Sequence, residues 1–190
     1  FTEEQRKAIE RIRKAAAGGD QLINRILDVE ASDVNRKRIQ LEPVRLHELL
    51  PEIARNFHLE ADMKGVILLK GSIPVITLLS DRQLLERAIS NLLSNALKFS
   101  SPGGRVWLEA GAEPGEVQVK VRDEGPGISP EDQRKIFAQY TRADASPTGG
   151  EKSTGLGLFI VQRIMHELQG TVTCRSTPGE GAEFTLHLRT

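Results

Sequence analysis

The sequence predicts one long amphipathic helix followed by a region in which helices and strands alternate. Apolar or small residues recur at alternating spacings of three and four along residues 1–35, which is the pattern of a helix that packs against another helix. From Leu41 onward the pattern changes to short runs of Val, Ile and Leu interrupted by Gly and Pro, which is typical of an α/β region. The length of 190 residues suits one domain with a helical appendage.

The charge and composition of the chain exclude several classes of function. The 26 basic and 26 acidic side chains give a net charge of zero, so the chain lacks the basic surplus that binding to nucleic acid or an anionic membrane requires. No apolar run approaches the roughly 18–20 residues that span a bilayer. We therefore expect no nucleic-acid partner, no direct membrane contact and a cytoplasmic location. The single cysteine, Cys174, rules out an internal disulfide framework and fits a reducing compartment.

The elements expected along the chain follow from these patterns. The helix over residues 1–35 starts with a capping box formed by Thr2 and Gln5, and Gly18 and Gly19 weaken its middle. Further helices are expected over residues 46–63, 81–99, 130–139 and 156–169. Strands are expected over residues 66–69, 73–76, 105–110, 117–123, 171–176 and 183–188. Residues 142–154 form a long stretch without periodicity, which is typical of a functional or disordered loop.

The helix expected over residues 81–99 carries polar side chains along one edge of its apolar stripe. Asn91, Asn95 and Lys98 follow one another at i, i+4 and i+7, beside a stripe made of Leu85, Ile89, Leu92, Leu93 and Ala96. An amide oxygen suits Mg²⁺, and a lysine can balance the charge of a phosphate. The alternative is that the two asparagines make hydrogen bonds between the helix and a strand.

A carboxylate and two glycines follow the strand expected over residues 117–123. Asp123 ends that strand, and Gly125 and Gly127 follow, which would let a planar ligand approach the backbone closely. The carboxylate of Asp123 can accept a hydrogen bond from the amine of adenine, where guanine would present a repelling carbonyl. Taken alone, the segment favours a simple turn.

A second glycine-rich segment ends the long loop and begins a helix. Gly155 and Gly157 leave backbone N–H groups uncovered at this helix start, which forms an anion site suited to a triphosphate. The segment is neither a dinucleotide-binding fingerprint nor a P-loop, because the chain has no Gly-x-x-x-x-Gly-Lys-Ser/Thr string.

The order of these segments resembles that of the sensor histidine kinases. Five strings correspond in order to the N, G1, F, G2 and G3 boxes of that family: NLLSNALKFS (91–100), DEGPGI (123–128), IFAQY (136–140), TGLGL (154–158) and GEGAEF (179–184). Residues 22–30 resemble the second helix of the dimerisation hairpin, so the resemblance covers nearly the whole chain.

The resemblance implies an α+β two-layer sandwich, in which helices cover one face of a mixed β-sheet, preceded by one long α-helix. It divides the chain into a hairpin helix with linker over residues 1–40 and an ATP-binding catalytic domain over residues 41–190, with residues 142–154 as a mobile lid. It implies that Asn95 binds Mg²⁺, that Asn91 supports the metal and phosphates, and that Asn91, Asn95 and Lys98 serve catalysis. The implied contacts to ATP come from Asn91, Asn95, Lys98, Asp123, Gly125, Gly127, Ile128, Arg142, Thr154, Gly155, Leu156 and Gly157.

The implied activity is transfer of the γ-phosphate of ATP to a histidine, for relay to an aspartate in the receiver domain of a response regulator. The hairpin helix implies a homodimer in the full-length protein. The chain lacks the family's His-Glu-Leu-Arg-Thr-Pro-like string, and its histidines occur in other contexts, so we expect surface or packing roles for His47, His58, His166 and His187. We therefore expect an acceptor histidine outside this chain, through a cut between the hairpin helices, or a parent protein without one.

Two smaller features of the same segments concern the lid and the ribose side of the site. Phe137 and Tyr140 would anchor the base of the lid, or pack in the core as part of an amphipathic helix. Thr141 stands where the family commonly has an aromatic residue, which leaves the ribose side of the site less well matched.

Other functions stay open at this point. Gyrase, heat-shock chaperone and mismatch-repair ATPases share the implied fold and hydrolyse ATP with a Glu one turn before the metal-binding Asn. Asn91 occupies that place here and has no basicity to offer, which disfavours hydrolysis. A non-catalytic scaffold that binds nucleotide or a partner protein is a second alternative. A serine kinase acting on an anti-sigma partner is a third, which the hairpin-like helix disfavours.

Overall fold

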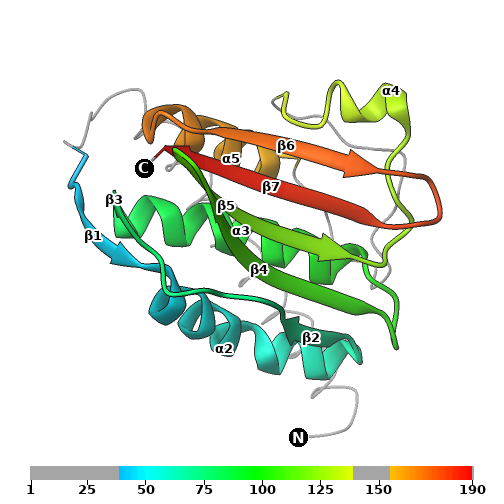
Figure 1. Cartoon of the computed structure of the whole chain (residues 1–190). Helices are drawn as coiled ribbons and strands as arrows, with labels where there is room; N and C mark the ends of the chain where they lie inside the picture. Colours follow the sequence, from blue (N-terminus) through cyan, green and yellow to red (C-terminus); the bar gives the residue numbers. More distant parts are fainter. Residues whose placement is uncertain (1–38, 139–154, 190) are drawn as a thin grey trace, which may run out of the picture. The chain divides into compact units, whose positions relative to one another are not determined.

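A five-stranded mixed sheet with helices on one face dominates the computed structural model, which describes residues 39–138 and 155–189 (Figure 1). The strand order is β2-β4-β5-β7-β6, and only the β2–β4 pair is parallel. The strands span Ile67–Lys70 (β2), Arg105–Glu113 (β4), Glu116–Asp123 (β5), Thr171–Ser176 (β6) and Ala182–Arg189 (β7). A separate two-stranded sheet pairs β1 (Glu42–Arg45) with β3 (Thr77–Ser80) in antiparallel fashion.

Three long helices pack on the same face of the large sheet, behind it in the view of Figure 1. They are α2 (Leu46–Lys64), α3 (Arg82–Phe99) and α5 (Gly157–Glu167), and a short helix α4 (Pro130–Gln133) follows β5. Helix α3 begins where the sequence predicts, because the side chain of Asp81 accepts a hydrogen bond from the Leu84 N–H at 3.1 Å and so caps the helix. The cap fixes where α3 begins, and Lys98 lies in the last turn of the same helix.

The core lies between the helices and the sheet. Val117, Val119 and Val121 alternate along β5 and are at most 1% exposed, as expected for a strand with one face against helices. The apolar stripe predicted on α3 is likewise buried: Leu85, Ile89, Leu92, Leu93 and Ala96. The predicted two-layer α+β fold with a mixed sheet is therefore confirmed.

The opposite face of the sheet is polar. Trp107 projects there beside two guanidinium groups, with the Arg122 Cζ 4.0 Å and the Arg105 Cζ 5.2 Å from its ring centre.

Within the described residues, no helix is both long enough and apolar enough to cross a membrane.

Two predicted elements are wrong in their extent. The strand expected over residues 73–76 is absent, and β3 begins at Thr77 instead, because pairing with β1 sets the register and buries Leu78. Val75 is 84% exposed, so its apolar run does not mark a buried strand. The helix expected over residues 130–139 ends at Gln133, after which the chain turns and buries Ile136. Strand β1 was not predicted.

Candidate functional site

The two asparagines predicted to act together lie against the start of α5. A Cβ atom placed on Gly157 would lie 3.3 Å from Asn95 Nδ2 and 3.5 Å from Asn91 Oδ1, so the glycine lets the two helices approach closely. Asn91 Nδ2 donates a hydrogen bond to the Arg87 carbonyl at 2.9 Å, one turn earlier on the same helix. The structure therefore brings Asn91 and Asn95 close to Gly157, which follows them in the chain by 66 and 62 residues.

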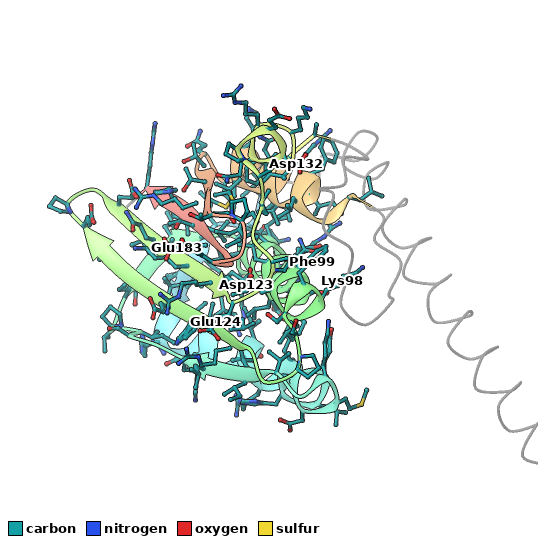
Figure 2. The ribbon with its side chains drawn as sticks, turned by 90° about the vertical axis from the view of Figure 1, so that its right-hand side faces the viewer. Lys98, Phe99, Asp123, Glu124, Asp132 and Glu183 are labelled. Atoms are coloured by element: carbon teal, nitrogen blue, oxygen red, sulfur yellow. The ribbon has the colours of Figure 1, made fainter. Side chains whose placement is uncertain are left out.

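The C-terminal end of α3 meets the turn that follows β5. A Cβ atom on Gly125 would lie 3.0 Å from the Phe99 carbonyl oxygen and 2.7 Å from Asp123 Oδ1. Figure 2 shows Asp123 beside this end of α3, which carries Lys98 and Phe99. The predicted phosphate-binding and base-reading residues thus lie on adjoining elements.

Asp123 is a buried carboxylate at the end of β5. It is 6% exposed, and its Oδ1 accepts hydrogen bonds from the Gly125 N–H at 2.8 Å and the Ala182 N–H at 3.3 Å. Burial raises the pKa of Asp123 to about 6, and the two backbone hydrogen bonds oppose this rise. A buried carboxylate with both bonds on one oxygen has the other oxygen available for a donor from a ligand.

The glycines of the turn after β5 serve a contact between two turns. Gly127 has φ +72°, and a Cβ atom there would collide with the Thr177 carbonyl in the turn that joins β6 to β7. Gly181 has φ +85°, and its Cβ would collide with the Asp123 carbonyl. Gly125 and Gly127 were expected to let a ligand approach closely, whereas the backbone of α3 and of the β6–β7 turn lies in that space.

Two side chains that no sequence motif marks hold this turn in place. Ser176 Oγ accepts a hydrogen bond from the Ile128 N–H at 2.8 Å, and Gln133 Nε2 donates to the Ile128 carbonyl at 2.8 Å. Ser176 and Ile128 are 48 residues apart, and neither Ser nor Gln has a distinctive spacing here, so no pattern in the sequence marked them.

Other predicted residues have plain structural surroundings or lie outside the described part of the chain. The Phe137 ring meets the Phe184 ring edge-on, with centroids 6.4 Å apart, which favours the packing interpretation. His187 Nδ1 lies 2.6 Å from Glu116 Oε1 on the polar face of the sheet. Leu156 is 2% exposed at the start of α5, next to Gly155 with φ +69°. The predictions for residues 1–38 and for Tyr140, Thr141, Arg142 and Thr154 fall outside the described residues.

Comparison with known proteins assigns the family. Residues 80–190 match the family described as histidine kinase-, DNA gyrase B-, and HSP90-like ATPase. The chain belongs to this family. The chain is 27% identical over 169 residues to the sensor protein SrrB of Staphylococcus aureus, a match that covers 89% of this chain and 29% of SrrB.

Solved structures give the same assignment for this ATP-binding domain. The crystal structure of full-length ShkA in complex with AMPPNP is 30% identical with a TM-score of 0.84, over 99% of this chain and 39% of ShkA. The mycobacterial sensor histidine kinase MprB is 25% identical with a TM-score of 0.70, over 78% of this chain and 97% of that structure. The predicted resemblance to the catalytic ATP-binding domain of a sensor histidine kinase is confirmed. The chain spans less than a third of the length of the SrrB relatives it matches.

Proposed function

We propose that this kinase domain binds Mg²⁺-ATP between α3, the turn after β5 and the start of α5. It transfers the γ-phosphate to a histidine outside this chain, from which the phosphate passes to an aspartate in the receiver domain of a response regulator. The buried carboxylate of Asp123 is the observation that carries this proposal, because its two backbone donors bond only Oδ1, and a donor from a ligand to Oδ2 would offset more of the cost of burying the charge.

Adenine supplies that donor in our proposal. Two backbone N–H groups fix Asp123 Oδ1, so Oδ2 is the oxygen that accepts from the exocyclic amine. Guanine has a carbonyl at that position, and two oxygens that both accept would repel each other. Ile128, Gly125 and Gly127 belong to the turn that positions this carboxylate, and we propose that the turn lies against the base.

The residues near Gly157 fit a magnesium ion and phosphates. Mg²⁺ is bound in proteins through few oxygen ligands together with the oxygens of phosphate groups, and Asn95 offers an amide oxygen within 3.5 Å of the Gly157 Cβ position. When bound, the ion neutralises charge on the phosphate oxygens. We propose that Asn91 supports this arrangement and that Lys98 contacts phosphate, as do Arg142 and Thr154.

The start of α5 would hold the phosphate chain. The first N–H groups of a helix have no acceptor within the helix, and the helix dipole favours an anion there. This start is formed by Gly155, Leu156 and Gly157. Gly155 has a left-handed conformation with φ +69° just before the helix begins. The triphosphate would then lie between α3 and α5, with the adenine at Asp123.

Transfer, rather than hydrolysis, follows from the side chains in this arrangement. Phosphoryl transfer depends mainly on holding the acceptor in line with the γ-phosphate and on balancing charge. Asn91 cannot take a proton from water, so the site holds ATP until an acceptor is presented. We further propose that residues 1–40 are the hairpin helix and linker of a homodimer, and residues 41–190 the catalytic domain.

Two measurements test this function. In calorimetric titrations with Mg²⁺, the chain should bind ATP clearly more tightly than GTP, and Asp123→Asn should weaken ATP binding by about 1.5–3 kcal/mol, the value of one hydrogen bond to a charged group. Equal affinity for the two nucleotides would contradict the role of Asp123.

Incubation with radiolabelled ATP tests the transfer step. The chain alone should neither label itself on histidine nor hydrolyse ATP rapidly, whereas the full-length protein should acquire an acid-labile label. Acid-labile phosphate on His47, His58, His166 or His187 would contradict an external acceptor. Rapid release of phosphate would favour an ATP hydrolase instead.

A further inference from the structure

Two side chains hold both backbone polar groups of Ile128. The Ile128 N–H donates to Ser176 Oγ at 2.8 Å, and the Ile128 carbonyl accepts from Gln133 Nε2 at 2.8 Å. Ser176 is the last residue of β6 and Gln133 is the last residue of α4. A residue in a turn that has both backbone groups bonded by side chains from other elements has little freedom to move.

Each of these two side chains makes a second hydrogen bond to a backbone carbonyl. Ser176 Oγ donates its hydrogen to the Gly181 carbonyl at 2.6 Å, and Gln133 Nε2 makes a second bond to the Ser176 carbonyl at 2.8 Å. The serine hydroxyl thus accepts and donates, and the glutamine amide donates twice. We call this set of four hydrogen bonds the Gln133–Ser176 clasp.

The clasp joins the two segments that orient the Asp123 carboxylate. One segment is the turn after β5, whose Gly125 N–H donates to Asp123 Oδ1. The other is the end of the β6–β7 turn, where Ala182 follows Gly181 and its N–H donates to the same oxygen. The Gly179 N–H also donates to the Pro126 carbonyl at 2.7 Å, so the two turns are in direct contact. A change in their separation would move the donors that hold the carboxylate.

We propose that Ser176 and Gln133 are positioning residues for adenine recognition, an inference that rests on the proposed function. They act through the turn: the clasp keeps Ile128 and the Asp123 carboxylate in one arrangement, so that the base does not have to order them on binding. Without the clasp, nucleotide binding itself must supply that ordering. Each side chain makes two of the four hydrogen bonds. We take the cost to ATP binding of removing one side chain as that of one hydrogen bond, roughly 0.5–1.5 kcal/mol, which corresponds to a roughly two- to twelvefold loss of affinity.

The variants Ser176→Ala, Gln133→Met and their combination test the clasp in the whole chain. Affinities for ATP and GTP are measured by calorimetry, and the hydrogen exchange of the Ile128 amide is followed by NMR. We expect each single variant to lose roughly two- to twelvefold in ATP affinity, with little change for GTP, so that the ratio of the two affinities falls. Because the two side chains share the clasp, the double variant should lose less than the product of the single losses.

Two further variants distinguish positioning from a general loss of stability. Ser176→Thr keeps a hydroxyl and should retain both ATP affinity and slow exchange at Ile128. Gln118→Met is the matched control for Gln133→Met, because Gln118 also donates through its amide, to Glu116 at 2.9 Å, but on the polar face of the sheet. It should leave the ATP-to-GTP ratio unchanged. If Ser176→Ala does not fold, Gln133→Met alone still decides, because it lies on the short helix α4.

The outcomes separate the two proposals. A wild-type chain that prefers ATP, with Ser176→Ala and Gln133→Met variants that keep the same ATP-to-GTP ratio, would overturn the positioning role alone. A wild-type chain that binds ATP and GTP equally would overturn the proposed function and the positioning role with it. Loss of Ile128 protection together with a lower ratio would support both.

Discussion

We expect nucleotide binding to be sensitive to acid, because Asp123, the adenine-reading residue of the proposed function, is a buried carboxylate. Burial raises the pKa of Asp123 to about 6, and a hydrogen bond from the adenine amine favours the ionised form. Between pH 7 and pH 5 the ionised fraction of a group with this pKa falls from roughly nine-tenths to roughly one-tenth. We therefore expect the affinity for ATP to fall about tenfold over this interval, since the protonated acid is a poor acceptor.

The stability of the fold depends on this group in the opposite direction. The folded-state pKa lies above the ordinary value of 3.8, so folding favours the protonated form. The stabilisation from Asp123 is fully present below about pH 3.8 and is lost as the pH rises through about 6, to an extent of roughly 3 kcal/mol. A loss of ATP binding at pH 5 therefore does not come from unfolding through Asp123.

Calorimetric titration with Mg²⁺-ATP at half-unit steps from pH 5 to pH 8 checks this expectation. The phosphates of ATP also titrate in this interval, so the matched control is Asp123→Asn, which has no acid at this position. The wild-type chain should lose about tenfold more affinity than the variant between pH 7 and pH 5. Parallel pH profiles for the two proteins would refute the assignment of Asp123 as the base-reading acid.

Three further predictions follow from the geometry. Asn95→Ala should abolish most of the magnesium dependence of ADP binding, measured by titration with and without Mg²⁺; an unchanged dependence would make Asn95 a structural residue. Gly127→Ala should lower the free energy of unfolding by more than Gly103→Ala. Both residues have positive φ, but only a Cβ on Gly127 meets backbone. Equal losses would show that the turn around Gly127 shifts to make room for the Cβ. Leu92→Ala should cost about 2–5 kcal/mol in urea unfolding, since Leu92 is 0% exposed in the core; a loss below about 1 kcal/mol would place it outside the tightly packed region.

The parts of the fold that local chemistry determines could be predicted from the sequence. Helix α3 has a capping aspartate and an apolar stripe at helical spacing, and strand β5 alternates valine with polar residues, so both were located to within a residue or two. Strands β1 and β3 depend on each other instead. Pro43 pairs with Leu79 and Val44 with Leu78, and a run of four residues carries too little pattern to reveal such a partner 34 to 36 residues away.

The candidate site divides in the same way. Asp123, Asn95 and Gly157 stood out in the sequence because a carboxylate at a strand end, an asparagine beside an apolar stripe and a glycine at a helix start are uncommon there. The structure brings Asn95 and Gly157 together, and their roles in binding stay predictions. Ser176 and Gln133 could not, because a serine at a strand end and a glutamine in a short helix are ordinary choices for solvent-exposed positions. Their importance depends on the meeting of two turns, which only the packing of β5 beside β7 and β7 beside β6 brings about.

This division has a physical consequence for how the site works. The chemistry that would recognise a nucleotide lies in a few side chains, but an ionised carboxylate, which only accepts hydrogen bonds, selects an amine only where its free oxygen is aimed at the base. Asp123 Oδ1 accepts from the N–H groups of Gly125, in the turn after β5, and of Ala182, the first residue of β7, so the orientation of the acid depends on how that turn lies against the start of β7. Preorganised polar groups discriminate between ligands more strongly than flexible ones, because the wrong ligand leaves them unpaired. Selectivity for adenine should therefore depend on Ser176 and Gln133 as well as on the carboxylate's charge.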